Sequence, residues 1–341
     1  MSRRLAILTA GGDCPGLNAV IRAAVRRAER LGLRVVGLRD GFSGLETLDV
    51  VELGPSHVSG LLTRGGSILR CSGANPFRQR ETAERCRENF QRLGAEALIA
   101  VGGEHTMKVA EAARRHGIPV VGVPKTIDND VPGTDLTFGF DTAVAVATEA
   151  IDRLHTTAES HNRLIVVEVM GRRSGWIATF AGMAGGADAI LIPERPFRLE
   201  EVCALIRRRG EIGKYFSIVV VGEGARFEGE EPVAAGHKAD GSALWGGIGH
   251  VLAERLEAAV GIETRVTVLG HVQRGGTPTA TDRILATRYG VHAVDLASSA
   301  RFGRMAAIRG GRMTDVDLSE AAGGPRPVDP EMYELAGVFF G

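Results

Sequence analysis

The stretch Pro124-Lys125-Thr126-Ile127-Asp128-Asn129-Asp130 follows a short β-branched run, Ile118 to Val123, whose composition is typical of a buried strand. A strand that ends in this loop presents the loop's side chains at its carboxyl end, which is where open α/β sheets bind ligands. The loop combines one hydroxyl, two carboxylates and one ammonium group. Such groups can accept a proton, hold a metal ion and meet a phosphate, although Asp and Asn are also ordinary turn residues.

The composition is that of a globular protein with room for a substantial core. The 341 residues are 44% hydrophobic and 24% charged, and a chain of this length is expected to form about two domains. Lys plus Arg and Asp plus Glu each number 41, so no net charge is available to recruit nucleic acid or an anionic membrane. Any anion site must therefore be local.

The cysteines and the apolar runs indicate a compartment. Four cysteines are widely spaced without a C-x-x-C pair, which argues against a zinc site or a disulfide framework and fits a reducing cytosol. The apolar run that follows Arg3-Arg4 stops at Gly11, which is too early for a signal peptide. No run approaches the roughly 18 apolar residues of a membrane helix. We therefore expect a cytoplasmic protein with no membrane and no nucleic-acid partner.

Strand, loop and helix alternate through the first 130 residues. Four buried strands are expected, at Leu5–Thr9, Val35–Leu38, Ala97–Val101 and Ile118–Val123. With helical segments between them, this alternation predicts a mostly parallel sheet that is covered by helices on both faces. The loops after Ala10, Val101 and Val123 are then expected to gather at one edge of the sheet.

The three gathered loops would supply complementary groups. The first carries Gly11 and Gly12, whose backbone amides can approach a phosphate at a helix N-terminus. The second carries Glu104, and the third carries the two aspartates. Oxygen ligands for a hard cation beside amides for phosphate oxygens suit a Mg²⁺-bound polyphosphate. Taken alone, each glycine loop is equally consistent with a tight strand-to-helix turn.

A second α/β unit is expected after a helix that begins at Asp141. Its strands are expected at Leu164–Val169, at Tyr215–Val221 and from Arg265 onward, with residues 225–249 as a polar excursion over the surface. The last strand has an arginine at its start and His271 and Arg274 near its end, beside a glycine pair. This combination suits an anionic phosphate ester, although single arginines are also common on solvated loops.

Four motifs occur in the order found in bacterial-type phosphofructokinases, and the chain resembles that family over nearly its whole length. They are Gly11-Gly12-Asp13-x-Pro-Gly-x-Asn, Pro-x-Thr-Ile-Asp-Asn-Asp at 124–130, Met170-Gly171-Arg172 and Gly270-His271-x-Gln-Arg274-Gly-Gly. The polar excursion and Lys125 look most like the actinobacterial branch, whose members use ATP or pyrophosphate.

The resemblance implies a fold of two similar Rossmann-like three-layer α/β domains with mostly parallel sheets and an active site in the cleft between them. The phosphoryl-donor domain would comprise residues 1–139 with about 274–323. The sugar-phosphate domain would comprise 140–273 with about 324–341.

The resemblance also implies a role for each matching residue. Asp128 would take the proton from the sugar 1-hydroxyl, assisted by Thr126 and Arg172, and Glu104 would be a ligand of the Mg²⁺ cofactor. Fructose 6-phosphate would be held by Asp130, Arg163, Met170, Gly171, Glu223, Arg265, His271 and Arg274. Pyrophosphate or ATP would be held by Gly12, Gly73, Gly103, Glu104, His105, Thr106 and Lys125. Arg163 and Arg265 would come from a neighbouring subunit, so a homodimer or homotetramer is expected.

The donor side departs from the family pattern at two positions. His105 stands where ATP-using relatives have glycine and pyrophosphate-using relatives have aspartate. Its side chain is expected to crowd the nucleotide's α-phosphate and so favour the smaller donor. Gly73 replaces an arginine that contacts donor phosphates in the family, and Arg70 is a candidate to supply that charge instead.

Three functions stay open at this point. The first is phosphorylation of fructose 6-phosphate at its 1-position, reversible if pyrophosphate is the donor. The second is the same transfer to another ketose phosphate, such as sedoheptulose 7-phosphate. The third is a catalytically weakened paralogue that only binds a sugar phosphate. A Rossmann oxidoreductase is disfavoured, because no G-x-G-x-x-G follows the first strand.

Overall fold

The computed structural model describes residues 3–237 and 243–341. The chain divides into two compact units, Met1–Thr142 with Arg274–Pro325, and Ala143–Gln273 with Arg326–Gly341. The polypeptide therefore passes from the first unit to the second after Thr142, returns at Arg274 and passes over again at Arg326. Each unit has its own sheet.

The first unit is built on a mostly parallel sheet. The described residues form eight strands in the order β14-β13-β5-β4-β1-β2-β3, with β6 paired to β5. The strands at the two ends, β3 and β14, run antiparallel to their neighbours, and the strands between them are parallel. Their bounds are β1 Arg4–Thr9, β2 Arg34–Leu38, β3 Val50–Leu53, β4 Ala97–Gly102, β5 Val120–Thr126, β6 Phe138–Gly139, β13 Arg304–Arg309 and β14 Arg312–Asp317.

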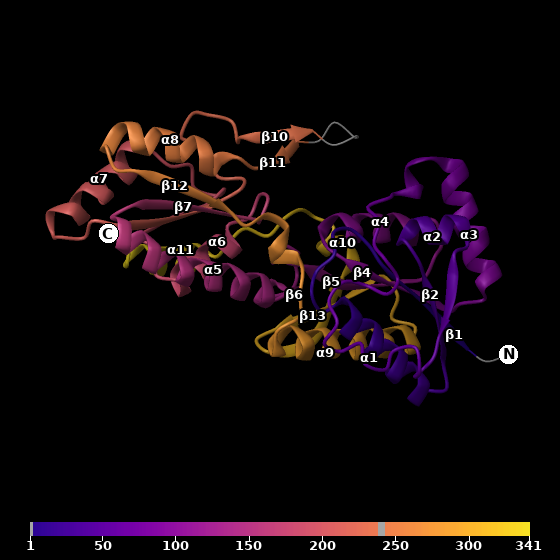
Figure 1. Ribbon diagram of the computed structural model, residues 1–341. Helices are drawn as coiled ribbons and strands as arrows, with labels where there is room; N and C mark the ends of the chain where they lie inside the picture. The colour runs from indigo at the N-terminus through magenta and orange to yellow at the C-terminus, as the bar shows by residue number, and fades with distance from the viewer. Residues whose placement is uncertain (1–2, 238–242) are drawn as a thin grey trace. The chain divides into compact units, whose positions relative to one another are not determined.

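Helices cover both faces of this sheet, as expected from the alternation of strands and helices (Figure 1). On one face, α1 (Leu17–Arg30) packs along α9 (Ala280–Ser298). The other face carries α2 (Phe42–Thr47), α3 (Arg80–Leu93), α4 (Glu104–Arg115) and α10 (Leu318–Ala321), with the short 3-10 helix η1 (Pro76–Arg78). Because helices shield the sheet from both sides, β1, β4 and β5 are almost wholly buried.

β5 extends beyond the end that its apolar run predicts. The apolar run stops at Val123, but the strand continues to Thr126, because β6 pairs Phe138 with Lys125 and Gly139 with Thr126. Lys125 and Thr126 therefore project from a paired strand. The acidic loop itself begins only at Ile127.

The second unit is built on a smaller, fully parallel sheet. Its described strands lie in the order β12-β7-β9-β8. Helices α7 and α8 pack on one face, and α6 and α11 pack on the other (Figure 1). The bounds are β7 Leu164–Val169, β8 Ala189–Leu191, β9 Ser217–Gly222, β12 Thr264–Val268, α5 Phe140–His161, α6 Trp176–Ala184, α7 Leu199–Glu211, α8 Ile248–Val260, η2 Gly270–Arg274 and α11 Pro330–Gly337.

The prediction of an irregular excursion over residues 225–249 is wrong in part. Two short strands, β10 (Ala234–His237) and β11 (Ala243–Trp245), pair antiparallel within it, while residues 238–242 lie outside the described residues. The segment then enters α8, whose first turn is capped by the buried carboxylate of Glu168. This carboxylate accepts hydrogen bonds from the backbone N–H groups of Gly247, at 3.0 and 3.1 Å, and Gly249, at 2.8 Å.

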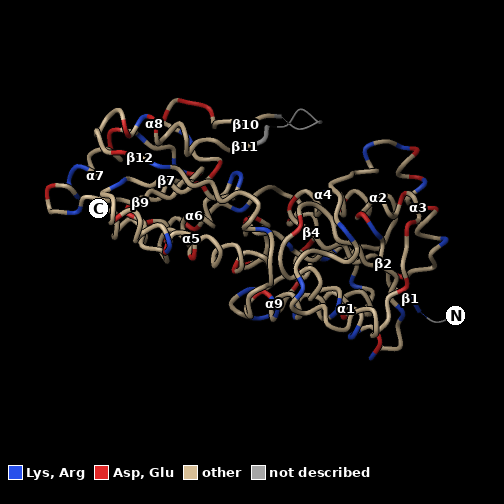
Figure 2. Tube along the Cα trace, in the orientation of Figure 1, with Lys and Arg blue, Asp and Glu red and all other residues tan. Residues whose placement is uncertain are grey.

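Charge is distributed evenly along the chain. Figure 2 shows Lys and Arg interspersed with Asp and Glu through the elements of both units, which agrees with the equal numbers of basic and acidic residues. Among the described residues, no helix has the length and apolar character that crossing a bilayer requires.

Candidate active site

The loops after β1, β4 and β5 meet at one edge of the first unit's sheet, as predicted. In the sheet Thr9 is in register with Val101, and Gly102 with Pro124, so the carboxyl ends of the three strands lie side by side. The Ala10 N–H donates to the Val101 carbonyl at 2.9 Å. The edge therefore brings the glycine loop, the N-terminus of α4 and the acidic loop into contact.

Lys125 is directed at the glycine loop. Its side chain is only 3% exposed, and its ammonium group donates a hydrogen bond to the carbonyl of Gly12. Thr106 lies close by: a β-carbon built on Gly11 would be 3.3 Å from the Thr106 hydroxyl and 3.7 Å from the ammonium. The Thr106 hydroxyl is buried and has no hydrogen-bond partner among the described residues. An orphaned hydroxyl beside a buried cation suits an anionic ligand.

The acidic loop is held in a defined shape by its own polar residues. The Asp128 N–H donates to the Thr126 hydroxyl at 3.0 Å, and Asn129, with a left-handed φ of 51°, accepts from the Thr137 N–H at 2.9 Å. Asp128 is 5% exposed, whereas Asp130 is half-buried. The loop thus presents one carboxylate that is largely withdrawn from water and one that is more open to it.

Glu104 and His105 begin helix α4, where backbone N–H groups and the helix dipole favour anions. Glu104 is half-buried and forms an ion pair with Lys108, one turn along the helix. His105 is exposed, and its Nε2 lies 3.3 Å from the carbonyl oxygen of Gly73. The imidazole therefore extends toward Gly73, the position at which the expected arginine is missing.

Arg70 does not supply the missing charge. Its guanidinium lies 2.6 Å from a carboxylate oxygen of Asp40 and 3.2 Å from one of Asp49. Both partners are acidic, so the positive charge is already neutralised. The interpretation of Arg70 as a substitute for an arginine at position 73 is therefore wrong for this structure.

Two residues expected at the sugar phosphate, Asp130 and Arg274, lie in the first unit. Arg274 packs over the glycine loop: a β-carbon on Gly12 would lie 2.0 Å from its Nη1. Its Nε is buried and has no hydrogen-bond partner among the described residues. Gly12 is thus flanked by the cations of Arg274 and Lys125. Asp13, the acid next in the chain, is exposed.

The remaining sugar-phosphate candidates lie in the second unit, where the loops after β7 and β9 contact each other. The Arg172 N–H donates to the Glu223 carboxylate at 2.9 Å, and the Glu223 N–H donates to the Val169 carbonyl at 2.8 Å. Arg172 is exposed and has a left-handed φ of 53°, so the backbone of the loop is strained at this residue. Gly171 and Met170 precede it at the end of β7 and are buried.

Gln273 is a positioning residue that the sequence reasoning did not single out. It is fully buried in η2, donates to the Gly270 carbonyl at 3.0 Å and accepts from the Met170 N–H at 3.4 Å. It therefore ties the segment that carries the exposed His271 to the Met170 loop. The sequence signal was available, because this glutamine lies inside the Gly-His-x-Gln-Arg motif.

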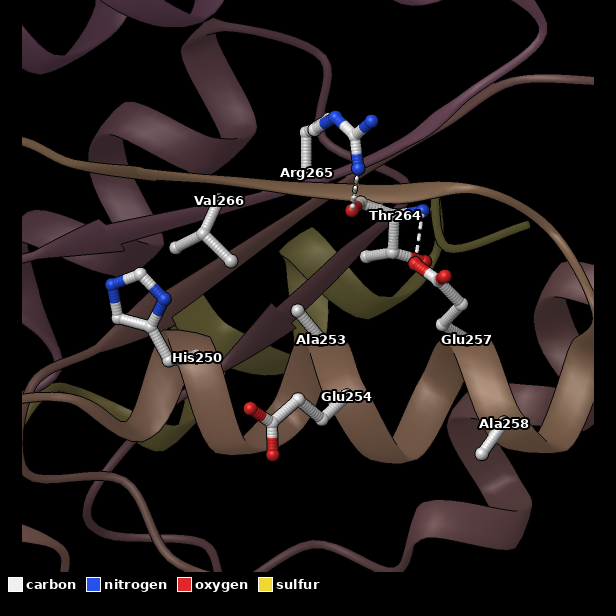
Figure 3. A pocket seen from close by; sticks show the side chains of 8 residues that line it. All are labelled: His250, Ala253, Glu254, Glu257, Ala258, Thr264, Arg265 and Val266. Atoms are coloured by element: carbon white, nitrogen blue, oxygen red, sulfur yellow. Dashed lines mark hydrogen bonds between the residues drawn. The ribbon is translucent and has the colours of Figure 1, made fainter.

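Arg163 and Arg265 form a separate pair away from these loops. Both contact Glu263, and the Arg163 guanidinium makes two bonds to it, at 2.8 and 3.0 Å. The hydrogen bonds from Arg163, with the charges of both arginines, lower the pKa of Glu263. Arg265 also lines a pocket of about 570 Å³ between α8 and β12, which Figure 3 shows together with His250, Glu254 and Glu257.

The contact between the loops after β7 and β9, which we call the sugar-phosphate loops for the role expected of them, gives a direct test of the geometry. A β-carbon on Gly224 would lie 1.7 Å from the backbone oxygen of Arg172, which cannot move as a side chain can. We expect Gly224→Ala to lower the free energy of unfolding by about 1–3 kcal/mol, because the backbone of one loop must shift. Urea denaturation measures this. Gly210→Ala is the control, since nothing lies within 4 Å of its β-carbon position; equal effects of both changes would contradict the packing.

Comparison with known proteins identifies the fold. The sequence profile described as Phosphofructokinase matches residues 4–297 of this chain. The chain belongs to the phosphofructokinase family. The candidate site residues thus fall into two sets, one in each unit of a phosphofructokinase fold.

Curated members of the family are similar over their whole length. A pyrophosphate–fructose 6-phosphate 1-phosphotransferase of Streptomyces coelicolor is 52% identical, with 99% of this chain and 100% of the relative covered. ATP-dependent 6-phosphofructokinase 3 of the same organism is 50% identical, with 98% of each chain covered. Proteins named for the two donors are thus about equally similar to this chain.

Solved phosphofructokinases share the fold. The structure of Pichia pastoris phosphofructokinase in the T-state is 31% identical in sequence and matches with a TM-score of 0.86. The match covers 99% of this chain and 36% of the Pichia chain. A pyrophosphate-dependent phosphofructokinase from Marinobacter aquaeolei matches with a TM-score of 0.83 at 23% identity, covering 96% of this chain and 86% of that one, and shows the fold alone.

Proposed function

We propose that this protein transfers a phosphoryl group from pyrophosphate or ATP to the 1-hydroxyl of fructose 6-phosphate, giving fructose 1,6-bisphosphate. The observation that carries the proposal is the meeting, at one sheet edge, of the glycine loop, the α4 N-terminus and the loop of Asp128. Phosphoryl transfer depends mainly on positioning and charge neutralisation, and this edge provides amides, cations and carboxylates together. Full-length relatives named for this reaction support the substrate pair.

Asp128 is the proposed general base. Its carboxylate is nearly buried, while the Thr126 hydroxyl fixes the backbone beside it. A base in this place takes the proton from the sugar hydroxyl as the phosphoryl group arrives, and Arg172 neutralises charge on the transferred group. Donor phosphates are proposed to lie on Gly12, Gly103, Thr106 and Lys125, near Glu104, His105 and Gly73.

The residues present fit a Mg²⁺ ion. Asp128, Asp130 and Glu104 offer hard carboxylate oxygens, and no group of three or more His, Cys, Asp or Glu side chains that could hold a metal occurs among the described residues. Mg²⁺ is commonly bound by one or two carboxylates together with substrate phosphates and water rather than by an all-protein cage. When bound, the ion would neutralise charge on the donor phosphates; Glu104 would hold it, with Asp130 helping to place it.

The sugar phosphate is proposed to contact Met170, Gly171, Glu223 and His271 of the second unit, with Asp130 and Arg274 of the first. Arg163 and Arg265 are proposed to serve the site of a neighbouring subunit in a homodimer or homotetramer. Support comes from β12, which carries Arg265, because it is an edge strand with exposed residues and is free to face another chain.

Four free cysteines support action in a reducing cytoplasm.

An acceptor panel tests the substrate. The purified protein with Mg²⁺ and either donor is given fructose 6-phosphate, sedoheptulose 7-phosphate or unphosphorylated fructose, and each product is identified by mass spectrometry and phosphorus NMR. We expect the largest kcat/KM with fructose 6-phosphate. We expect no product from fructose, because fructose carries no phosphate group for the basic residues of the second unit to bind. A larger kcat/KM with sedoheptulose 7-phosphate would replace the proposed acceptor.

His105 is proposed to favour the smaller donor. We expect His105→Gly to raise the ratio of kcat/KM with ATP to kcat/KM with pyrophosphate by a factor of about 5 to 100. The reason is that the substitution removes a clash of roughly 1–3 kcal/mol that only the nucleotide meets. Steady-state kinetics with both donors measures the ratio. His116→Gly, at the opposite end of α4, is the control. An unchanged ratio would remove the steric role of His105.

A further inference from the structure

Asp282 is a buried acid that the proposed reaction does not use. It lies in the first turn of α9, is fully buried, and forms no salt bridge among the described residues. Burial raises the pKa of Asp282 to about 6, the negative charge of Asp141 adds to the rise, and hydrogen bonds from Thr142 and Gly139 oppose it. A carboxylate buried without a cation destabilises a fold, so packing alone does not explain this residue.

The bonds of Asp282 leave its own helix. Thr279 is the N-cap of α9, and its hydroxyl accepts a hydrogen bond from the Asp282 N–H at 3.3 Å. In a capping box the Asp282 carboxylate would in turn accept from the Thr279 N–H, but here it does not. Instead it accepts from the N–H of Thr142 at 2.8 Å and from the Thr142 hydroxyl at 2.5 Å. Thr142 lies in the first turn of α5, so Asp282 satisfies orphan donors of a different helix.

α5 returns the contact. The Thr279 N–H donates to the Thr142 hydroxyl at 3.0 Å, and the Thr279 hydroxyl donates to the Asp141 carboxylate at 2.5 Å. The N-termini of α5 and α9 therefore cap each other. We call the four residues Asp141, Thr142, Thr279 and Asp282 the mutual cap.

The mutual cap stands beside both principal connections of the chain and beside the acidic loop. Thr142 is the last residue before the chain enters the second unit, and Thr279 follows the return at Arg274 by five residues. Gly139 precedes Thr142 by three residues, belongs to β6 and is in register with Thr126 of β5. A displacement of the cap would therefore be transmitted over one strand pair to the residues around Asp128.

We propose that Asp282 is a positioning residue for phosphoryl transfer, which joins the starts of α5 and α9 and thereby holds β6 and the Thr126–Asp128 segment in place. This inference rests on the proposed phosphotransferase function for its kinetic consequences. Its mechanical part, the restraint of the two helix starts, does not depend on turnover. The two parts can therefore be tested separately.

Three variants test the inference: Asp282→Ala, Asp282→Asn and Thr142→Val. Asparagine keeps an acceptor for the Thr142 N–H, whereas alanine removes it. Valine keeps the shape of Thr142 but loses the hydroxyl, and it tests the same contact from α5 if Asp282→Ala does not fold. Asp329→Ala is the matched control, because Asp329 caps α11 in the second unit and is not part of the mutual cap.

The kinetic readout is kcat and KM for fructose 6-phosphate and donor. We expect Asp282→Ala and Thr142→Val to lower kcat by a factor on the order of 10 to 100, because misplacement of reacting groups has effects of this size. KM for fructose 6-phosphate should change less than about twofold, since the sugar-phosphate loops of the second unit are untouched. Asp282→Asn should recover most of kcat, and Asp329→Ala should not lower it.

The mechanical readout is hydrogen exchange in peptides spanning residues 125–142 and 274–285. We expect faster exchange there in Asp282→Ala and Thr142→Val and unchanged exchange in Asp329→Ala. Faster exchange without a loss of kcat would overturn the positioning role, and unchanged exchange would overturn the mutual cap. If the wild type is inactive but the variants still show faster hydrogen exchange, the proposed function is refuted. The mutual cap then remains as a contact that only stabilises the fold.

Discussion

Replacing Asp128 with alanine is expected to lower kcat by a factor of about 10² to 10⁴, the range that a general base contributes. Asp128 is 5% exposed, and its backbone N–H is held by the Thr126 hydroxyl, so water cannot readily take the place of its carboxylate. KM for fructose 6-phosphate should change little, because the residues proposed to hold the sugar phosphate lie mainly in the second unit. The expected pattern is therefore a loss in kcat with substrate binding retained.

The measurement pairs steady-state kinetics with calorimetric titration of fructose 6-phosphate. Asp128→Asn is a closer substitute that removes the base while keeping the shape of the side chain, and it should be as slow as Asp128→Ala. Asp152→Ala, an exposed aspartate on α5, is the control and should leave kcat unchanged. Near-normal turnover in either Asp128 variant would exclude Asp128 as the base.

The second large effect is expected from restoring an arginine at position 73. Nothing lies within 4 Å of the β-carbon position of Gly73, and its φ is not in the left-handed region, so a side chain can be accepted there. A charge-assisted hydrogen bond contributes about 1.5–3 kcal/mol, and Gly73→Arg is therefore expected to tighten donor binding by roughly one to two decades. Arg70 does not compete for this role, because Asp40 and Asp49 already bind it.

Two controls separate charge from bulk at this position. Gly73→Gln adds a side chain of similar reach without the charge and should leave the donor KM close to that of the wild type. Gly73→Arg combined with His105→Gly removes the imidazole that approaches the Gly73 carbonyl and tests whether the two side chains compete for space. A donor KM that is equal in the Arg and Gln variants would contradict the electrostatic account.

The parallel sheets were predictable from the sequence because their strands are apolar runs that end in glycine loops. β1, β4, β7 and β9 lie within two residues of the expected positions. Because these strands are buried on both faces, each is a nearly continuous apolar run that is easy to recognise in the sequence. β13 and β14 were not predicted. Arginines interrupt both strands and two aspartates interrupt β14, and the antiparallel pairing of β13 with β14 is visible only in the fold.

The candidate site was predictable to the extent that strand ends define it. The sequence indicated that three loops meet, but not that Lys125 points to Gly12 or that β6 extends β5 through Thr126. Those features depend on contacts between segments far apart in the chain, and the mutual cap of Asp282 with Thr142 joins residues 140 positions apart.

The most direct test of the proposed reaction is a donor matrix. Purified protein, Mg²⁺ and fructose 6-phosphate are incubated with ATP or with pyrophosphate, fructose 1,6-bisphosphate is followed with time, and each reaction is repeated with excess chelator. We expect bisphosphate to form with at least one donor, with pyrophosphate favoured by His105, and formation to stop when Mg²⁺ is removed. Absence of bisphosphate with both donors would contradict the proposed function.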